Sequence, residues 1–171
     1  MWLLDDGPLG NLASFSPQVA HWPKGSLHVA ESVGDSAAQD KSGRRQALLR
    51  AHGEGGPLFV SHSVLPGTPA WEMLYLHLRK DTTSTTANLG EHECIAICAH
   101  LRADLVFVCQ DRRATQIALS ELGRGRVASP FDCWDSLRQD GLIDDAAFLA
   151  LCQRSLRGDR GLPGVPWRFR M

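Results

Sequence analysis

The chain lacks the features that mark membrane-spanning, secreted and disulfide-rich proteins. It has no run of about 18 apolar residues and no charged-then-apolar leader, so we expect no membrane association and a cytoplasmic location. Its five cysteines form an odd set without a CxxC pair, which indicates reduced thiols rather than a disulfide framework. No His/Cys spacing suits zinc either. These absences leave an ordinary globular domain as the expected class.

Signatures of several nucleotide-binding and phosphate-transferring families are also missing. Gly53-Glu54-Gly55-Gly56 does not follow the strand that a P-loop or a dinucleotide fingerprint requires. Asp5-Asp6-Gly7 lacks the DxD pattern of haloacid-dehalogenase phosphatases. Val60-Ser61-His62-Ser63 lacks the Asp that a response-regulator receiver carries at the end of its third strand. We therefore rank these classes low.

Length and composition predict one domain followed by a basic tail. At 171 residues, with 43% hydrophobic and 22% charged residues, the chain can bury a self-sufficient core, which we place in residues 1–156. The formal net charge is −1, but from Arg154 onward five arginines face one acid, Asp159. We expect residues 157–171 to form a basic Gly/Pro/Arg tail, which suits either an acidic partner such as nucleic acid or simple exposure to solvent.

Apolar runs and helical patterns alternate along the chain. Strands are expected at residues 2–5, 27–29, 58–61, 105–109 and 127–128. Helices are expected at residues 8–13, 30 to about 51, 70–80, 91–101, 113–122, 130–139 and 144–156. Alternation of this kind is typical of parallel strands joined by right-handed crossovers. The predicted fold is a three-layer α/β/α sandwich around a parallel sheet of about five strands.

Two of the predicted strands run directly into carboxylates. Trp2-Leu3-Leu4 is followed by Asp5 and Asp6, and the apolar run at residues 105–109 is followed by Gln110 and Asp111. Ligands of open parallel sheets bind beyond the carboxyl ends of the strands. We therefore predict a shared acidic pocket at that edge of the sheet.

Several segments together resemble the PIN domain family, in particular its toxin-type, VapC-like ribonuclease branch. The opening strand is LLDDGPL at residues 3–9, and LGEHECIAICA at residues 89–99 is similar to the family's L-G-E-x-E-x-x-A helix. LVFVCQDRRA at residues 105–114 resembles its fourth strand and D-x-x-A turn, and residues 127–143 resemble its ending. VAESVGD at residues 29–35 is a weaker match. The order and spacing of these segments are more specific than any one of them.

The resemblance implies a metal-dependent endoribonuclease that hydrolyses RNA phosphodiester bonds with Mg²⁺ or Mn²⁺. Carried over by position, the catalytic and metal-binding acids would be Asp5, Asp35, Glu93 and Asp111. The implied partners are RNA, an antitoxin protein if the chain is the toxin of a toxin–antitoxin pair, and a second copy in a homodimer. In such chemistry a divalent ion activates the attacking water, and Mg²⁺ prefers oxygen ligands. Carboxylates that are crowded together also repel one another unless a cation binds between them.

Supporting positions follow from helix geometry and from neighbours in sequence. Glu91 and Glu93 lie about 200° apart on a regular helix, so both cannot face one metal, and we prefer Glu93 as ligand with Glu91 in support or as a cap. Asp6 is expected to cap a helix or to orient a metal-bound water. Arg112 and Arg113 are candidates for contacts with RNA phosphates, although surface arginines are common.

Two departures from the family pattern keep a second hypothesis open. Asp6 replaces the usual small hydroxyl residue, and Gln110 stands where some relatives carry a further acid. The second acid of the cluster could be Glu31 instead of Asp35, since the two lie four residues apart. The competing hypothesis is a non-catalytic relative that uses the same fold to bind nucleic acid or a protein.

Overall fold

A five-stranded parallel sheet forms the centre of the computed structural model, which describes residues 1–15, 19–81, 83, 84 and 86–158. The strand order is β5-β2-β1-β6-β7. The strands are β1 (Trp2–Leu4), β2 (Leu27–Ala30), β5 (Phe59–His62), β6 (Val106–Val108) and β7 (Val127–Ala128). β1 pairs with β2 on one side and with β6 on the other. The expected parallel sheet is confirmed.

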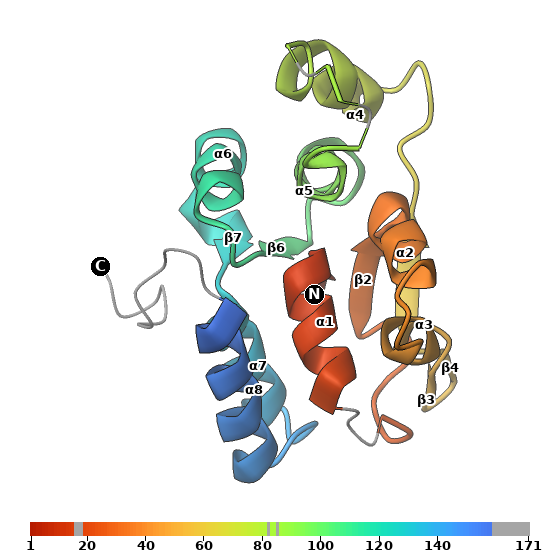
Figure 1. The fold of residues 1–171 in the computed structure, drawn as a ribbon, viewed down its shortest axis with the longest axis vertical. Coiled ribbons are helices and arrows are strands. Elements are labelled where there is room, and N and C mark those ends of the chain that lie inside the picture. The colour runs from red at the N-terminus through yellow and green to blue at the C-terminus, as the bar shows by residue number, and fades with distance from the viewer. Residues whose placement is uncertain (16–18, 82, 85, 159–171) are drawn as a thin grey trace.

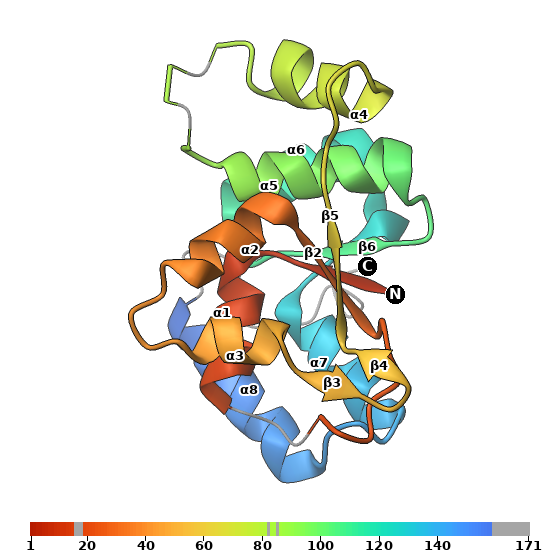
Figure 2. The same ribbon diagram turned by 90° about the vertical axis from the view of Figure 1, so that its right-hand side faces the viewer.

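Helices cover both faces of this sheet (Figures 1 and 2). One face carries α1 (Asp6–Phe15), α3 (Arg44–Leu49), α7 (Pro130–Gln139) and α8 (Asp145–Gly158). The other carries α4 (Pro69–Glu72), α5 (Leu89–Ala96) and α6 (Arg112–Leu122), while α2 (Glu31–Ala38) packs against both α3 and α5. The predicted α/β class with helices flanking the sheet is therefore correct.

The central strands are almost wholly buried, which explains why their sequences are continuous apolar runs. Leu3 and Leu4 of β1 and Phe107 of β6 have no exposed surface. Trp22 and Trp134 are also fully buried, and each places its indole N–H in a hydrogen bond, to the Leu142 carbonyl at 2.9 Å and to the Ser155 hydroxyl at 2.9 Å respectively. Of the five free cysteines, four are buried and Cys152 is half-buried.

The helix expected from residue 30 to about residue 51 was wrong, because the chain forms two helices there. Ser42 donates from its backbone N–H (3.2 Å) and its hydroxyl (2.7 Å) to the Asp40 carboxylate, which closes a turn after α2. Gly43 then adopts φ +67° immediately before α3. The conformation of Gly43 is one that a continuous right-handed helix excludes.

A small antiparallel hairpin, β3 (His52–Gly53) and β4 (Gly56–Pro57), was not expected. Two further helices change type along their length: α4 continues as the π-helix η1 (Met73–Leu78), and α5 as the π-helix η2 (Ile97–Leu101). A short 3₁₀ turn, η3 (Arg124–Arg126), precedes β7. In the described part of the chain no helix has the length and apolarity to cross a membrane.

The last helix is longer than predicted. α8 continues to Gly158, so Arg157, which we expected in the basic tail, is helical. The remainder of the expected tail, residues 159–171, lies outside the described residues.

Candidate active site at the carboxyl edge of the sheet

Asp5 stands at the carboxyl end of the central strand, where the strand order changes direction between β1 and β6. Its backbone N–H donates to the Val108 carbonyl at 3.1 Å, which continues the β1–β6 ladder. Its own carbonyl accepts from the Leu9 N–H at 3.0 Å, which begins α1. The backbone of Asp5 is therefore fixed on both sides, and the residue is only 6% exposed. This position is the usual ligand site of doubly wound sheets.

Carboxylates from three separate elements line one cavity of about 530 Å³ beside Asp5. Asp5 follows β1, Glu91 lies in the first turn of α5, and Asp111 is the N-cap of α6. The complete lining is Asp5, Asp6, Gly7, Glu91, Gln110, Asp111 and Arg157. The shared acidic pocket predicted from the two strand ends is thus present as a geometric feature.

Burial and the neighbouring carboxylates disfavour the ionised form of Asp5. Burial raises the pKa of Asp5 to about 8, and the negative charges of Glu91, Asp6 and Asp111 add to the rise. A hydrogen bond from the Asp6 backbone acts in the opposite direction but is outweighed. At neutral pH the metal-free pocket therefore keeps a proton on Asp5. A cation held there would favour the ionised carboxylate instead.

The two glutamates of α5 have different surroundings. Glu91 reaches the cavity beside Asp5. Glu93 is 6% exposed, and its carboxylate accepts from the Ser32 backbone N–H at 3.0 Å and from the Ser32 hydroxyl. Glu93 therefore ties α5 to the start of α2. The sequence-based preference was for Glu93 as ligand and Glu91 in support, and the structure places Glu91 nearer the cavity.

Asp111 has a structural role in addition to its place in the cavity. One carboxylate oxygen accepts from the Ala114 N–H at 2.9 Å, which caps α6. A carboxylate that caps through one oxygen retains a second oxygen for another partner. The capping of α6 by Asp111 therefore coexists with its position in the cavity.

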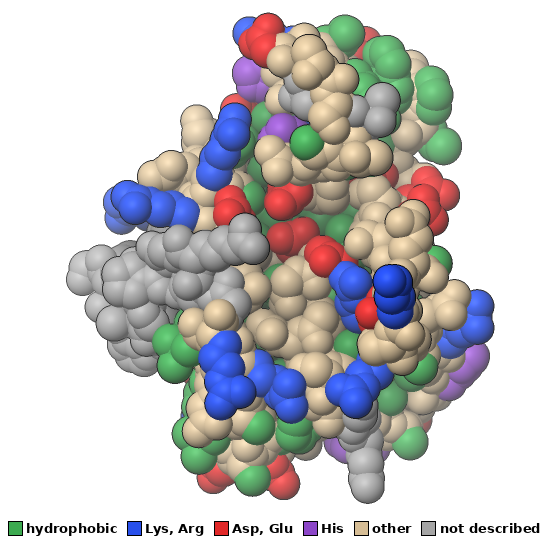
Figure 3. Space-filling model, in the orientation of Figure 1, with side chains coloured by type: hydrophobic (Ala, Val, Ile, Leu, Met, Phe, Trp, Pro, Cys, Tyr) green, Lys and Arg blue, Asp and Glu red, His purple; other side chains and the backbone are tan. Residues whose placement is uncertain are grey.

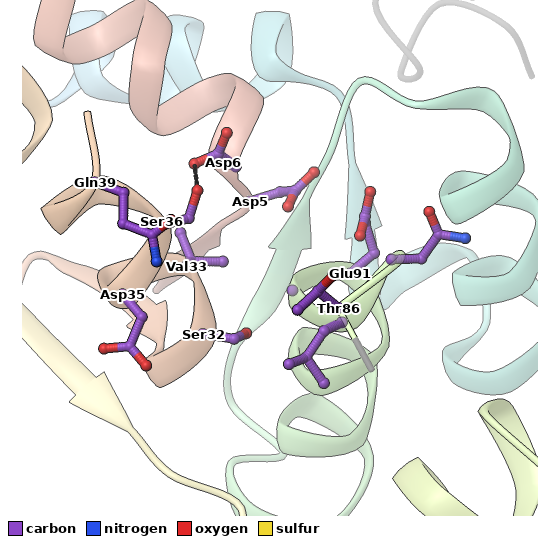
Figure 4. A pocket seen from close by; sticks show the side chains of 12 residues that line it. Asp5, Asp6, Ser32, Val33, Asp35, Ser36, Gln39, Thr86 and Glu91 are labelled. Atoms are coloured by element: carbon purple, nitrogen blue, oxygen red, sulfur yellow. Dashed lines mark hydrogen bonds between the residues drawn. The ribbon is translucent and has the colours of Figure 1, made fainter. Parts of the chain in front are cut away.

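Asp35 and Asp6 lie on the α2 side of the site. Asp35 is exposed on the rim of a second cavity, and Figure 4 shows its carboxylate pointing away from Asp5 and Glu91. Asp6 accepts from the Ser36 hydroxyl at 3.2 Å and forms an ion pair with Arg45. The Arg45 side chain is only partly exposed. Its pairing with Asp6 joins positions 39 residues apart, which a local sequence pattern does not reveal.

Basic side chains surround the acidic centre on the face shown in Figure 3. Arg112 and Arg113 are exposed at the start of α6, next to Asp111. Arg157 of α8 lines the cavity itself. The sequence assigned Arg157 to the tail, although the apolar spacing of the last helix could have been followed further.

The donor chemistry and the donor spacing of this site give different answers about a metal. Carboxylate oxygens are the ligands that Mg²⁺ and Mn²⁺ prefer, and Mg²⁺ keeps several waters, so a few acids suffice. Among the described residues, however, no group of three or more His, Cys, Asp or Glu side chains is close enough to hold a metal ion as they stand. The residue types fit a hard cation, and the side chains would have to turn inward to bind it.

Comparison of the chain with models of protein families, with curated proteins and with solved structures found no match.

Proposed function

We propose that this protein is a metal-dependent endoribonuclease of the PIN type, which hydrolyses RNA phosphodiester bonds with Mg²⁺ or Mn²⁺. The observation that supports this most is the cavity lined by Asp5, Glu91 and Asp111, which come from three elements at the carboxyl edge of the sheet. Asp5 and Asp111 follow the carboxyl ends of β1 and β6, which are adjacent in the sheet. The order of the sequence segments that resemble the PIN family agrees with this arrangement.

Each side chain has a role in this proposal. Asp5, Glu91 and Asp111 would hold the cation, and Arg157 with Arg112 and Arg113 would bind the phosphates of RNA. The cation, when bound, would lower the pKa of a water and stabilise charge on the leaving oxygen. Asp5 gives up its proton to take part, since only the ionised carboxylate is a ligand.

The remaining acids of the sequence-based set have positioning roles in the proposal. Glu93 holds the start of α2 through Ser32, and so fixes the wall on which Asp35 stands. Asp35 stays at the rim of the second cavity, outside the group of acids that would hold the cation. Asp6 is paired with Arg45, which offsets part of its negative charge beside the cation site.

A non-catalytic nucleic-acid-binding module is the second candidate. It is favoured by one observation, that no three acidic or histidine donors in the described residues stand within reach of a single ion. The arginines that flank the cavity serve this candidate equally well.

Cleavage of a mixed RNA pool with Mn²⁺, with Mg²⁺ and with EDTA tests the proposal. Asp5→Asn and Asp111→Asn should each lower the rate at least about a hundredfold, because each removes a carboxylate from the cation site. Asn at position 111 can still cap α6, so the loss would not come from unfolding. Asp140→Asn, at the exposed end of α7, is the matched control and should cut as wild type does.

Metal-independent RNA binding without any cleavage would support the second candidate instead. The antitoxin partner and the homodimer implied by the family resemblance stay predictions. Co-purification with the product of a small neighbouring gene would support the first, and light scattering would test the second.

A further inference from the structure

A second cavity, of about 550 Å³, opens on the other side of the acidic centre. It shares Asp5, Asp6 and Glu91 with the first cavity, so the two meet at the same carboxylates. The rest of its polar wall is mostly uncharged and comes from α2 and from the loop before α5: Ser32, Ser36, Gln39, Thr86 and Asn88. Figure 4 shows Gln39 and Ser36 on the α2 side and Thr86 with Glu91 on the α5 side.

Asn88 has an unusual conformation on this wall. It adopts φ +53°, and no other non-glycine residue of the described chain has a positive φ. Asn88 occupies the N-cap position of α5, yet its side chain makes no capping hydrogen bond. Asn is one of the residue types preferred as a helix N-cap, so an amide that does not cap is available to face the cavity. Uncommon backbone conformations cluster at binding sites.

A buried arginine holds this wall in place. Arg79 is 7% exposed, and it donates to the Ala87 carbonyl at 2.6 Å and to the Ser84 carbonyl at 2.7 Å. The Ser84 hydroxyl in turn accepts from the Ala87 N–H at 3.1 Å. Burying a guanidinium is costly unless it is well hydrogen-bonded, so the chain commits a charged side chain to shaping this loop. The wall that carries Thr86 and Asn88 is thus preformed.

We propose that the second cavity binds the nucleoside next to the cleaved phosphate and that Asn88 and Gln39 read the edge of its base. This inference rests on the proposed function and names the substrate subsite of the same centre. An amide side chain offers both a donor and an acceptor, which is the pattern that base edges present. The volume lies within the range of small-molecule sites. Apart from Asp35 and the shared carboxylates, the polar wall of the second cavity is uncharged and suits a base, whereas Arg157 in the first cavity suits a phosphate.

The test is fluorescence anisotropy with short oligoribonucleotides of A, of C and of U, in EDTA so that no cleavage occurs. The measured quantity is the ratio of Kd between the weakest-bound and tightest-bound RNA. Asn88→Gly removes the amide but allows the positive φ, and Gln39→Ala removes the other amide from an exposed helix end. Each should lower this ratio about three- to tenfold, the effect of one lost hydrogen bond.

Gln116→Ala, at an exposed position of α6 outside both cavities, is the matched control and should leave the ratio unchanged. The inference is overturned if wild type binds the three RNAs equally, if it binds none of them, or if both variants keep the wild-type ratio. Metal-dependent cleavage is scored separately. RNA that is cut while the ratio stays unchanged would leave the proposed function and remove the subsite. A lowered ratio without any cleavage would leave the subsite and remove the hydrolysis.

Discussion

At the scale of single residues, Asp5 combines an unfavourable environment with a fixed position. Its carboxyl group is buried beside three other acids, and this raises its pKa to about 8. A residue that served only to stabilise the fold would not need this arrangement, since a neutral isostere could make the same backbone contacts. Perturbed carboxyl groups in cavities are candidates for functional roles for this reason.

Asp5→Asn should stabilise the metal-free protein, and more so at high pH. The folded-state pKa of about 8 lies above the usual 3.8, so between these values the folded protein keeps a proton that the unfolded chain releases. Stability is therefore lost as pH rises through this window, at up to about 1.4 kcal/mol for each unit of pKa difference. We expect the variant to gain roughly a few kcal/mol over wild type at pH 8 and much less at pH 4.

Urea unfolding in EDTA at both pH values measures this difference, with Asp140→Asn as the control that should show no trend. An equal change in unfolding free energy at pH 4 and pH 8 would contradict the predicted role of the Asp5 proton.

The sequence located Asp5 and Asp111 because a strand end is a local feature. It could not determine which of Glu91 and Glu93 faces the cavity, since helix phase depends on what the helix packs against. The partner of Glu93 is Ser32, which is 61 residues away in the sequence. The same limit applies to Asp6, whose charge is balanced by Arg45 across 39 residues.

At the scale of elements, the five strands of the sheet were predictable because parallel buried strands are short apolar runs. The β3–β4 hairpin was not, since strands of two residues have no period to detect. Its position depends on Gly53, where an added Cβ would lie 2.0 Å from the Trp22 carbonyl oxygen. Backbone at that distance cannot move aside as a flexible side chain could.

Gly53→Ala should therefore destabilise the protein by about 1–3 kcal/mol or more, the range for overpacked sites. Gly125→Ala is the matched control, because nothing lies within 4 Å of the Cβ that it would add. We expect Gly125→Ala to change the unfolding free energy by less than about 0.5 kcal/mol. Thermal or urea unfolding of both variants decides the matter, and equal stability of the two would show that the Trp22 contact can relax.

At the scale of the whole molecule, the nearly neutral net charge conceals an ordered distribution. The acidic centre lies at the carboxyl edge of the sheet, and Lys and Arg side chains lie around it on the same face (Figure 3). The sequence indicated basic character at its end and at Arg112 and Arg113, but not that Arg157 and these two residues lie near the same acidic centre. The fold brings these charges to one face, because α6 and α8 lie on opposite sides of the sheet and both reach its carboxyl edge (Figure 1).

The salt dependence of RNA binding should report this arrangement. For single strands the slope of log K against log salt concentration is about −0.7 for each phosphate that is neutralised. Replacing both Arg112 and Arg113 by Gln should make the slope shallower by about 1.4 if each contacts one phosphate. Arg124→Gln is the control, because Arg124 precedes β7 at the opposite edge of the sheet and is exposed. A double variant with the wild-type slope would exclude α6 from the path of the RNA.

The two cavities that meet at Asp5 have a consequence for the topology of the substrate. A site with space on both sides of its reactive centre accommodates a strand that enters on one side and leaves on the other. Such a strand is held by its interior, and its free ends take no part in recognition. Under the proposed function, a covalently closed RNA circle would therefore be opened at the same rate as the linear molecule of the same sequence.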